Sequence, residues 1–497
     1  MDNQVMPSDK KEVKKFYDIH VHALDLSHPN LSAFLFKDDL FRSLVTWKFR
    51  ALCLFVPLLS VIPSSLINRT VKKLIEKSTF DDTLSFYELP LEYQFLLWEY
   101  FLRNPNNKGE KDKTEEDKKH KILNKKGEFS LDEKRKTTFN KIVLCPLAID
   151  FFYQNSRKKD NVFYNKTVYK PIIKQTGDLF YAIRTYYRFK LDPKGNDCND
   201  LKLVEIKEDW GEKNLDEKME GWQEKELNEV VKEWREKQLS EIKKDLIEIK
   251  KEKLFEIYPF MGLNTQNYSL EKIDKMLNKY FSNFKKDETK TERRERLYEK
   301  IGVFDGKMFE ENEDIYKDIF AGIKVYPPLN FDPYPDKEEE KKKVELLYQY
   351  CVDKRIPIIT HCSDGGFKVG NYDDCTNPNE KWKKVLEEYP DLTLCFAHFG
   401  RQEKWGRKNW KKMIIEFIEK YEYKNVYADI SCNCSTPKYY KELNKLMKEH
   451  SHLENKIIFG SDFSINMLAS QDINSYNTYL RKFIDGAIDP DVKKKCV

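Results

Sequence analysis

Eight short apolar runs constrain the fold of this chain more than any other feature of its sequence. After residue 254 the runs alternate with segments, such as 338–354 and 408–421, whose apolar residues recur at helical spacing. Most runs are continuously apolar, as expected of parallel strands that helices cover on the outside. We therefore predict strands at residues 16–22, 141–149, 255–263, 321–326, 356–361, 392–398, 425–430 and 457–461.

Eight strand-and-helix units that close on themselves form an α/β fold, the (β/α)8 TIM barrel, whose catalytic side chains project from the C-terminal strand ends. Two intervals are too long for a simple crossover, so we predict helical insertions after strands 1 and 2. The first barrel strand is expected within residues 1–23 and the first insertion at 24–140. Residues 141–497 would form the remainder of the barrel, including a long charged helix near 216–254.

Both insertions carry charged segments with two interpretations each. Residues 104–136 are mostly Lys, Glu, Asp and Asn, which predicts a mobile or disordered segment. Nucleic-acid binding is the alternative, but the mixed sign and the absence of interleaved aromatic residues disfavour it. The helix near 216–254 is expected to pack on the barrel surface, with a partner-binding or oligomerisation helix as the alternative.

Charge and cysteine usage limit the classes of partner. The 89 Lys and Arg residues nearly balance the 84 Asp and Glu residues, so no overall field points to nucleic acid or a membrane. Ten cysteines lie without a CxxC pair, which is typical of a reducing compartment. The N-terminal residues are polar, and the apolar stretch 51–63 is too short to cross a bilayer. We expect a cytoplasmic protein with a small-molecule substrate, and a homo-oligomer remains open.

Metal-ligand residues end several of the predicted strands. His20 and His22 would share one face of the first strand, because side chains alternate with period two. An HxH pair by itself is more often structural. Three later runs, however, end in His361, His398 and Asp462, so that four of the eight histidines lie at strand ends.

Imidazoles and a carboxylate suit zinc, manganese or iron, and such an ion with an open position activates bound water. We predict His20, His22, His361 and Asp462 as ligands of one divalent ion, most plausibly zinc. Asp462 could also accept a proton from water. His398 is predicted as a general acid or base, or as an electrophile on a developing oxyanion.

Together these stretches resemble the amidohydrolase-related branch of the amidohydrolase superfamily, which contains metal-dependent hydrolases and non-oxidative decarboxylases. By resemblance His20, His22 and His361 are metal ligands, Asp462 is a ligand or proton acceptor, and His398 is the catalytic histidine. The matching stretches, in family order, are Asp18-Ile-His20-Val-His22, Gly322-Ile-Lys324-Val-Tyr-Pro-Pro, Thr-His361-Cys-Ser-Asp-Gly-Gly, Ala-His398-Phe-Gly, Asn425-Val-Tyr-Ala-Asp429-Ile-Ser and Phe-Gly-Ser-Asp462.

Lys324 has three interpretations. In binuclear relatives a strand-four lysine is carbamylated and bridges two metals, whereas in mononuclear relatives the lysine contacts substrate or supports the site. An ordinary surface lysine is the third possibility. Asp18 is expected to orient the two strand-one histidines, Cys362 to be a buried structural thiol, and Arg401 to bind a substrate carboxylate or form a surface ion pair.

Three functions remain open at this point. The first is a hydrolase in which metal-activated water attacks an amide, lactone, ester or related carbon, with Lys324, His398 and Asp462 as catalytic residues. The second is a metal-dependent non-oxidative decarboxylase or lyase acting on a small carboxylate. The third is a barrel without catalytic activity that serves as a binding or assembly subunit.

Overall fold

The computed structural model describes the chain in twelve segments. Most of the predicted insertion at 24–140 and the predicted helix near 216–254 lie outside these segments, so both stay predictions. The described residues are 14–24, 91–103, 122–131, 138–151, 172–188, 253–299, 318–367, 373–402, 409–420, 423–433, 437–470 and 475–497, except 125, 379, 487, 490–492 and 494.

All ladders between the principal strands are parallel, and each of the eight predicted runs contains a strand. One sheet has the order β1 (Lys15–Val21), β4 (Lys141–Pro146) and β5 (Phe255–Ile257). The other has the order β11 (Ile457–Ile458), β10 (Val426–Asp429), β9 (Leu394–Phe396), β8 (Ile358–Thr360), β7 (Gly322–Val325) and β6 (Phe260–Gly262).

The run at 255–263 supplies one strand to each sheet, because Tyr258 and Pro259 interrupt it. Proline has no backbone N–H to donate to a ladder, which explains the break between β5 and β6. The same segment thus passes from the edge of the smaller sheet to the edge of the larger one.

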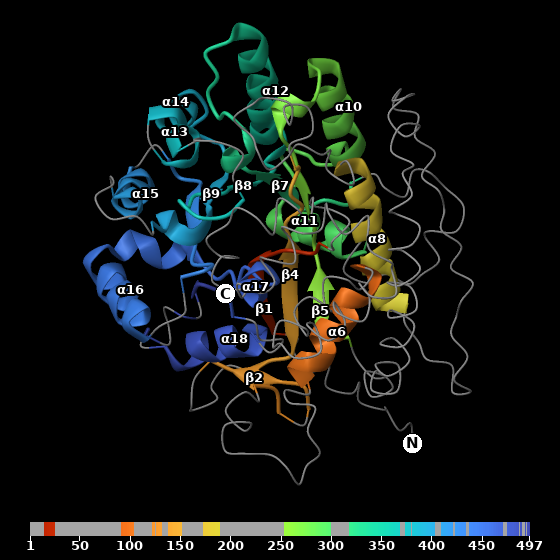
Figure 1. The fold of residues 1–497 in the computed structure, drawn as a ribbon, viewed down its shortest axis with the longest axis vertical. Coiled ribbons are helices and arrows are strands. Elements are labelled where there is room, and N and C mark those ends of the chain that lie inside the picture. Colours follow the sequence, from red (N-terminus) through yellow and green to blue (C-terminus); the bar gives the residue numbers. More distant parts are fainter. Residues whose placement is uncertain are drawn as a thin grey trace, which may run out of the picture.

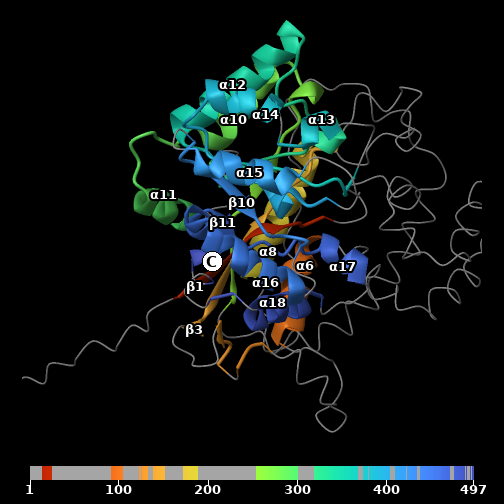
Figure 2. The same ribbon diagram turned by 90° about the vertical axis from the view of Figure 1, so that its left-hand side faces the viewer.

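Isolated bridges join the smaller sheet to both ends of the larger one. Val21 at the end of β1 pairs with Phe463 after β11, and Leu147 after β4 pairs with Phe260 in β6. The backbone N–H of Ile19 also donates to the carbonyl of Phe459 at 3.2 Å. The strands form the centre of the molecule in Figures 1 and 2, with helices outside them.

The helices after residue 254 follow the strands alternately, as the apolar periodicity predicts. Helix α10 (Leu270–Phe281) buries Ile273, Met276 and Leu277 on one stripe, and the Ser269 hydroxyl caps its first turn. The other helices are α6 (Leu91–Arg103), α8 (Ile172–Arg188), α11 (Lys290–Leu297), α12 (Glu338–Lys354), α13 (Asp373–Thr376), α14 (Glu380–Glu388), α15 (Trp410–Glu419), α16 (Pro437–Glu449), α17 (Ile465–Ser470) and α18 (Ser475–Asp485).

Short elements complete the described fold. The pair β2 (Phe129–Ser130) and β3 (Thr138–Phe139) is antiparallel and contributes Phe129 and Phe139 to contacts with Phe16 in β1. Four 3-10 helices lie in the loops, and they are η5 (Thr265–Asn267), η9 (Pro327–Leu329), η10 (Ala397–Gly400) and η11 (Ser451–Asn455).

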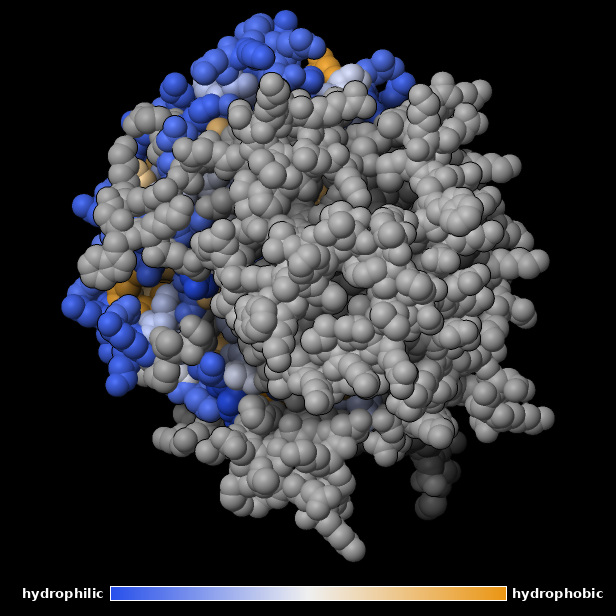
Figure 3. Space-filling view, viewed as in Figure 1, coloured by the Kyte–Doolittle hydropathy of each residue, from blue (hydrophilic) through white to orange (hydrophobic). Residues whose placement is uncertain are grey.

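The described surface is mostly hydrophilic where Figure 3 shows it. Among the large apolar residues that the structure describes, Leu270 is the exposed one, with 43% of its area accessible to solvent. Among the described helices, none combines the length and the apolar character that a membrane crossing requires.

Candidate metal centre

Strand β1 places two imidazoles at its C-terminal end. Its buried positions alternate, so Phe16, Asp18, His20 and His22 lie on one face, with Phe16 deepest in the aromatic core. The Nε2 atoms of His20 and His22 are 3.3 Å apart. The sequence prediction that this pair shares a face therefore agrees with the geometry.

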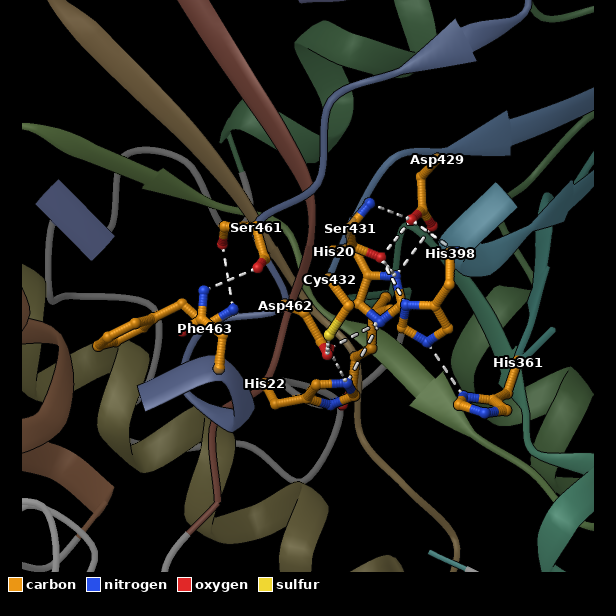
Figure 4. A network of polar contacts seen from close by, with 12 residues as sticks. His20, His22, His361, His398, Asp429, Ser431, Cys432, Ser461, Asp462 and Phe463 are labelled. Carbon is orange, nitrogen blue, oxygen red and sulfur yellow. Dashed lines mark hydrogen bonds and ion pairs between the residues drawn. The ribbon is translucent and has the colours of Figure 1, made fainter. Parts of the chain in front are cut away.

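Asp462, which follows β11, closes a triangle with the two histidines. Its Oδ1 lies 3.3 Å from His20 Nε2 and 3.2 Å from His22 Nε2 (Figure 4). The chain approaches His20 closely at this point, because a Cβ at Gly460 would lie only 2.7 Å from the His20 Cβ. A glycine is therefore required before Ser461 for Asp462 to reach the triangle.

The other nitrogens of both rings are already engaged as donors. His22 Nδ1 donates to the Leu147 carbonyl at 2.8 Å, and His20 Nδ1 donates to Asp429 Oδ2 at 2.9 Å. When each imidazole is neutral, its Nε2 then presents a lone pair toward the Asp462 carboxylate. Three acceptors that converge in this way require a positive charge, either a proton on His20 or a metal ion.

Burial and neighbouring charge set the protonation states in the triangle. Burial lowers the pKa of His22. Burial also acts to lower the pKa of His20, but Asp429 and Asp462 together outweigh it and raise that pKa. Burial would raise the pKa of Asp462, yet its contacts with His20 and His22 hold it well below its usual range. The Asp462 carboxyl is consequently ionised at neutral pH.

The triangle fits a divalent metal ion. Donor atoms about 2.1 Å from a tetrahedral zinc ion lie about 3.4 Å from one another. The edges of 3.2 and 3.3 Å between the His20, His22 and Asp462 atoms match that spacing. Two imidazole nitrogens and one carboxylate oxygen also form a donor set that leaves a fourth position open.

His361 and His398 lie beside this triangle and face each other. His398 Nε2 is 3.1 Å from His361 Nδ1. The opposite nitrogens are engaged, since His361 Nε2 is 3.2 Å from the Gly365 carbonyl and His398 Nδ1 is 2.9 Å from Ser431 Oγ. The Ser431 hydroxyl itself donates to Asp429, so it accepts from His398. The facing nitrogens of both histidines are therefore lone pairs.

Burial keeps this second pair neutral. It lowers the pKa of His361 well below its usual value and lowers the pKa of His398 to about 3. His398 belongs to a donor cluster with His20 and Asp429, whereas His361 reaches the triangle through its contact with His398. The structure thus brings His361 next to the centre, and its role as a ligand stays a prediction.

Lys324 lies on β7 and is buried, with 1% of its surface exposed. Its Nζ has no hydrogen-bond partner within the described part of the chain, and burial lowers its pKa to about 8. The interpretation of Lys324 as a surface lysine is therefore wrong. A carbamylated bridge and a substrate contact both remain predictions.

Comparison with known proteins gives a family match over part of the chain. The model of the family described as "Amidohydrolase" matches residues 296–495. Those residues belong to the amidohydrolase family. No curated protein shows significant similarity to the chain. The family contains enzymes that depend on metals, and the donor clusters around His20 and Asp462 are consistent with that property.

Three solved structures share limited similarity with the chain. The first is an amidohydrolase 2 from Bifidobacterium longum subsp. infantis, with 14% identity, coverage of 34% of this chain and 63% of that one, and a TM-score of 0.20. The second is 5-carboxyvanillate decarboxylase from Novosphingobium aromaticivorans with manganese and 4-hydroxy-3-methoxy-5-nitrobenzoic acid, with 12% identity, coverage of 48% and 61%, and a TM-score of 0.27. The third is a probable 2-pyrone-4,6-dicarboxylic acid hydrolase from Acinetobacter baumannii with citric acid, with 12% identity, coverage of 46% and 79%, and a TM-score of 0.22. The chain spans less than two thirds of the first two. Overlaps this small do not extend the family match beyond residues 296–495.

The amidohydrolase segment also contributes residues that the sequence left without a role. Asp429 ends β10 and accepts hydrogen bonds from His20 Nδ1 and from the backbone N–H of His398 at 3.0 Å. His20 holds the pKa of this buried carboxyl far below its usual range despite burial. Asp429 ends an apolar run as Asp462 does, and that signal was available in the sequence.

Three residues of the centre have left-handed backbone conformations. The φ angles are 61° at His398, 59° at Cys432 and 60° at Asp462. Residues other than glycine rarely adopt the left-handed region of φ and ψ, and each such residue costs on the order of 1–3 kcal/mol. The surrounding fold therefore stabilises an unfavourable backbone at each of these positions, which aims the side chains at one another.

The remaining predictions concern neighbours of the centre. Asp18 Oδ1 accepts from the backbone N–H groups of His20 at 3.3 Å and Ser461 at 3.0 Å, so it holds β1 against the segment before Asp462. Burial raises the pKa of Asp18 to about 7. Cys362 is fully buried, as expected. Arg401 Nη1 donates to the Cys432 carbonyl at 2.6 Å, which supports the turn after β10.

Proposed function

We propose that this chain is a metal-dependent hydrolase of the amidohydrolase type, acting on an amide, lactone, ester or related carbon of a small molecule. The observation that carries the proposal is the convergence of His20 Nε2, His22 Nε2 and Asp462 Oδ1 within 3.3 Å. We further propose a (β/α)8 barrel, supported by the bridges that join the smaller parallel sheet to both ends of the larger one.

We assign one divalent ion to the centre, zinc before manganese or iron, with His20, His22 and Asp462 as ligands and His361 as the further predicted ligand. Such an ion, when bound, lowers the pKa of water and polarises a substrate oxygen. Asp429 fixes the tautomer of His20 by accepting from its Nδ1 at 2.9 Å. Without the Asp429 acceptor, the imidazole proton of His20 would move from Nδ1 to Nε2, which faces the centre.

The residues around the centre can move protons and hold charge. The ionised Asp462 carboxylate is suited to accept the proton that an attacking water loses. His398 is neutral, and Ser431 holds its ring beside the triangle with Nε2 facing His361. We assign His398 to proton transfer at the leaving group or to contact with the developing oxyanion.

A non-oxidative decarboxylase or lyase is the second candidate, and Lys324 favours it. A decarboxylase needs a cation that anchors the substrate carboxylate, and the buried Lys324 Nζ lacks a hydrogen-bond partner among the described residues. The same amine could carry a carbamate that bridges two metals. A barrel without catalytic activity, acting as a binding or assembly subunit, is disfavoured by the convergent donor atoms.

The wider organisation is also a proposal. We infer a barrel made of residues 1–23 and 141–497 with a helical insertion at 24–140, and α6 is the described helix of that insertion. Seven described cysteines are free, which supports a cytoplasmic location. We expect a small-molecule substrate, no nucleic-acid or membrane partner, and an oligomeric state that gel filtration would establish.

The test is metal content followed by a single substitution. We expect about one equivalent of zinc, manganese or iron in protein purified without chelator, because the triangle offers one position with an open side. His398→Ala should keep that metal and lower kcat on amide, lactone or aromatic carboxylate substrates by about 10²–10⁴-fold. Elemental analysis and steady-state kinetics measure both effects.

His450→Ala is the matched control, since His450 pairs with Glu419 at the surface and should change neither metal nor kcat. Two equivalents of metal would support the carbamylated Lys324 bridge. An absence of metal, with no activity gained on adding it, would contradict the proposal and favour the binding-subunit interpretation.

A further inference from the structure

Cys432 lies in the turn after β10, next to Asp462. Its Sγ is 2.6 Å from Asp462 Oδ2, whereas Asp462 Oδ1 faces His20 and His22 (Figure 4). One oxygen of the carboxylate thus contacts the thiol, and the other contacts the two imidazoles. Residue Cys432 is partly buried, whereas the six other described cysteines are buried.

His398 completes a second cluster with these groups. One of its ring nitrogens, the Cys432 sulfur and an Asp462 oxygen all lie within 4.8 Å of one another. Its Nδ1 is engaged with Ser431 and its Nε2 with His361, so this imidazole borders the cluster without having to bind the ion. The convergence of His20 Nε2, His22 Nε2 and Asp462 Oδ1 is the observation that calls for a cation next to Asp462, beside the Cys432 sulfur.

A purely structural thiol explains these contacts poorly. A cysteine S–H is a weak hydrogen-bond donor, and serine would bond Asp462 more strongly at the same place. Thiolate sulfur differs from every other donor of this centre in being soft, and soft donors favour zinc over manganese or magnesium. The sulfur is therefore the one group here that would change which metal binds.

We propose that Cys432 is a metal ligand of this centre, acting with Asp462, and that its sulfur makes the centre selective for zinc over manganese. The inference rests on the proposed metal-dependent function. Binding transfers the thiol proton to solvent and forms one metal–sulfur bond, so no oxidant or reductant is needed.

The test uses the full chain loaded with cobalt, whose bonds to thiolate give a near-ultraviolet charge-transfer band. We expect that band in the wild type and its loss in Cys432→Ser, which keeps a hydrogen-bond donor beside Asp462. Zinc affinity should fall at least about tenfold in that variant, and manganese affinity should be unchanged. Cys351→Ala, at a buried cysteine of α12, is the control and should keep the band.

Other results would contradict either the role of Cys432 or the proposed function. Bound cobalt without the band in the wild type, or a band that survives in Cys432→Ser, overturns the inference while the metal centre stands. Equal losses of zinc and manganese affinity also overturn it, because Cys432 would then act only by positioning Asp462. A wild type that binds no cobalt, zinc or manganese contradicts the proposed function itself.

A second measurement covers a variant that does not fold. In the wild-type protein, zinc should protect Cys432 from alkylation by iodoacetamide, with the modified residue located by peptide mass spectrometry. The six other described cysteines are buried and provide the internal reference. Equal alkylation of Cys432 with and without bound zinc would overturn the inference.

Discussion

Two polar clusters of this molecule differ in whether each hydrogen-bond acceptor faces a donor. The first, at the N-terminal end of β5, centres on Glu99 of α6, which is fully buried. Its Oε1 accepts from Arg103 Nε at 2.7 Å and from the Leu254 backbone N–H at 3.1 Å, and its Oε2 accepts from the Tyr186 hydroxyl. That hydroxyl accepts in turn from the Phe255 N–H at 2.9 Å.

In the second cluster, the metal centre at the C-terminal strand ends, acceptors face acceptors. His20 Nε2 and His22 Nε2 converge on Asp462 Oδ1, and His361 Nδ1 opposes His398 Nε2. Glu99 and Tyr186 are as buried as His20, so burial alone does not distinguish a structural network from a functional one. The mismatch of donors and acceptors does, because it remains unfavourable until a cation arrives.

The largest expected effect is the loss of metal on removal of a triangle member. His20→Ala or Asp462→Ala should eliminate bound metal and detectable turnover, because only two of the three donors would remain. The protein should stay folded, since the substitution also removes an unfavourable convergence of acceptors. Elemental analysis and circular dichroism test this, and a variant that retains both metal and activity would contradict the assignment.

Glu99→Ala should have the opposite profile. It leaves Arg103, the Tyr186 hydroxyl and the Leu254 N–H without their shared acceptor, so the free energy of unfolding should fall by about 3 kcal/mol. Metal content per folded molecule should be unchanged. Denaturant unfolding measures the loss, with Glu271→Ala as control because that exposed pair with Lys275 contributes little. A loss of metal in Glu99→Ala would break the distinction between the clusters.

The smallest expected effect is that of Asp429→Asn. An amide beside His20 Nδ1 can donate to it, which would move the imidazole proton to Nε2 and remove the lone pair that faces the centre. Metal affinity should fall by about 10–100-fold without unfolding. Isothermal titration with zinc measures the change. Unaltered affinity would mean that Asp429 has no part in orienting His20.

Local pattern was sufficient to predict the strands and to single out His20, His22 and Asp462, which converge in the structure. The apolar runs specify strands whatever their neighbours, and the period of two places His20 and His22 on one face of β1. The run that ends in Asp462 likewise indicated a side chain at a strand end. The long predicted insertions stay predictions, since charge and helical periodicity alone do not specify where a segment packs.

The partners of Asp429 and Cys432 were not predictable, because these partners are remote in sequence. His20 and Asp429 are 409 residues apart, and Cys432 and Asp462 are 30 apart on different elements. Whether a polar side chain is satisfied depends on which atoms the fold brings within hydrogen-bonding distance.

The sequence by itself determined that this chain forms parallel strands alternating with helices and carries metal-ligand residues at strand ends, because these properties follow from local periodicity. Only the tertiary structure brings the lone pairs of His20, His22 and Asp462 Oδ1 to one place and puts Cys432 beside the other oxygen of Asp462. This arrangement depends on strand register and on the left-handed backbone at His398, Cys432 and Asp462, which residue type alone does not specify.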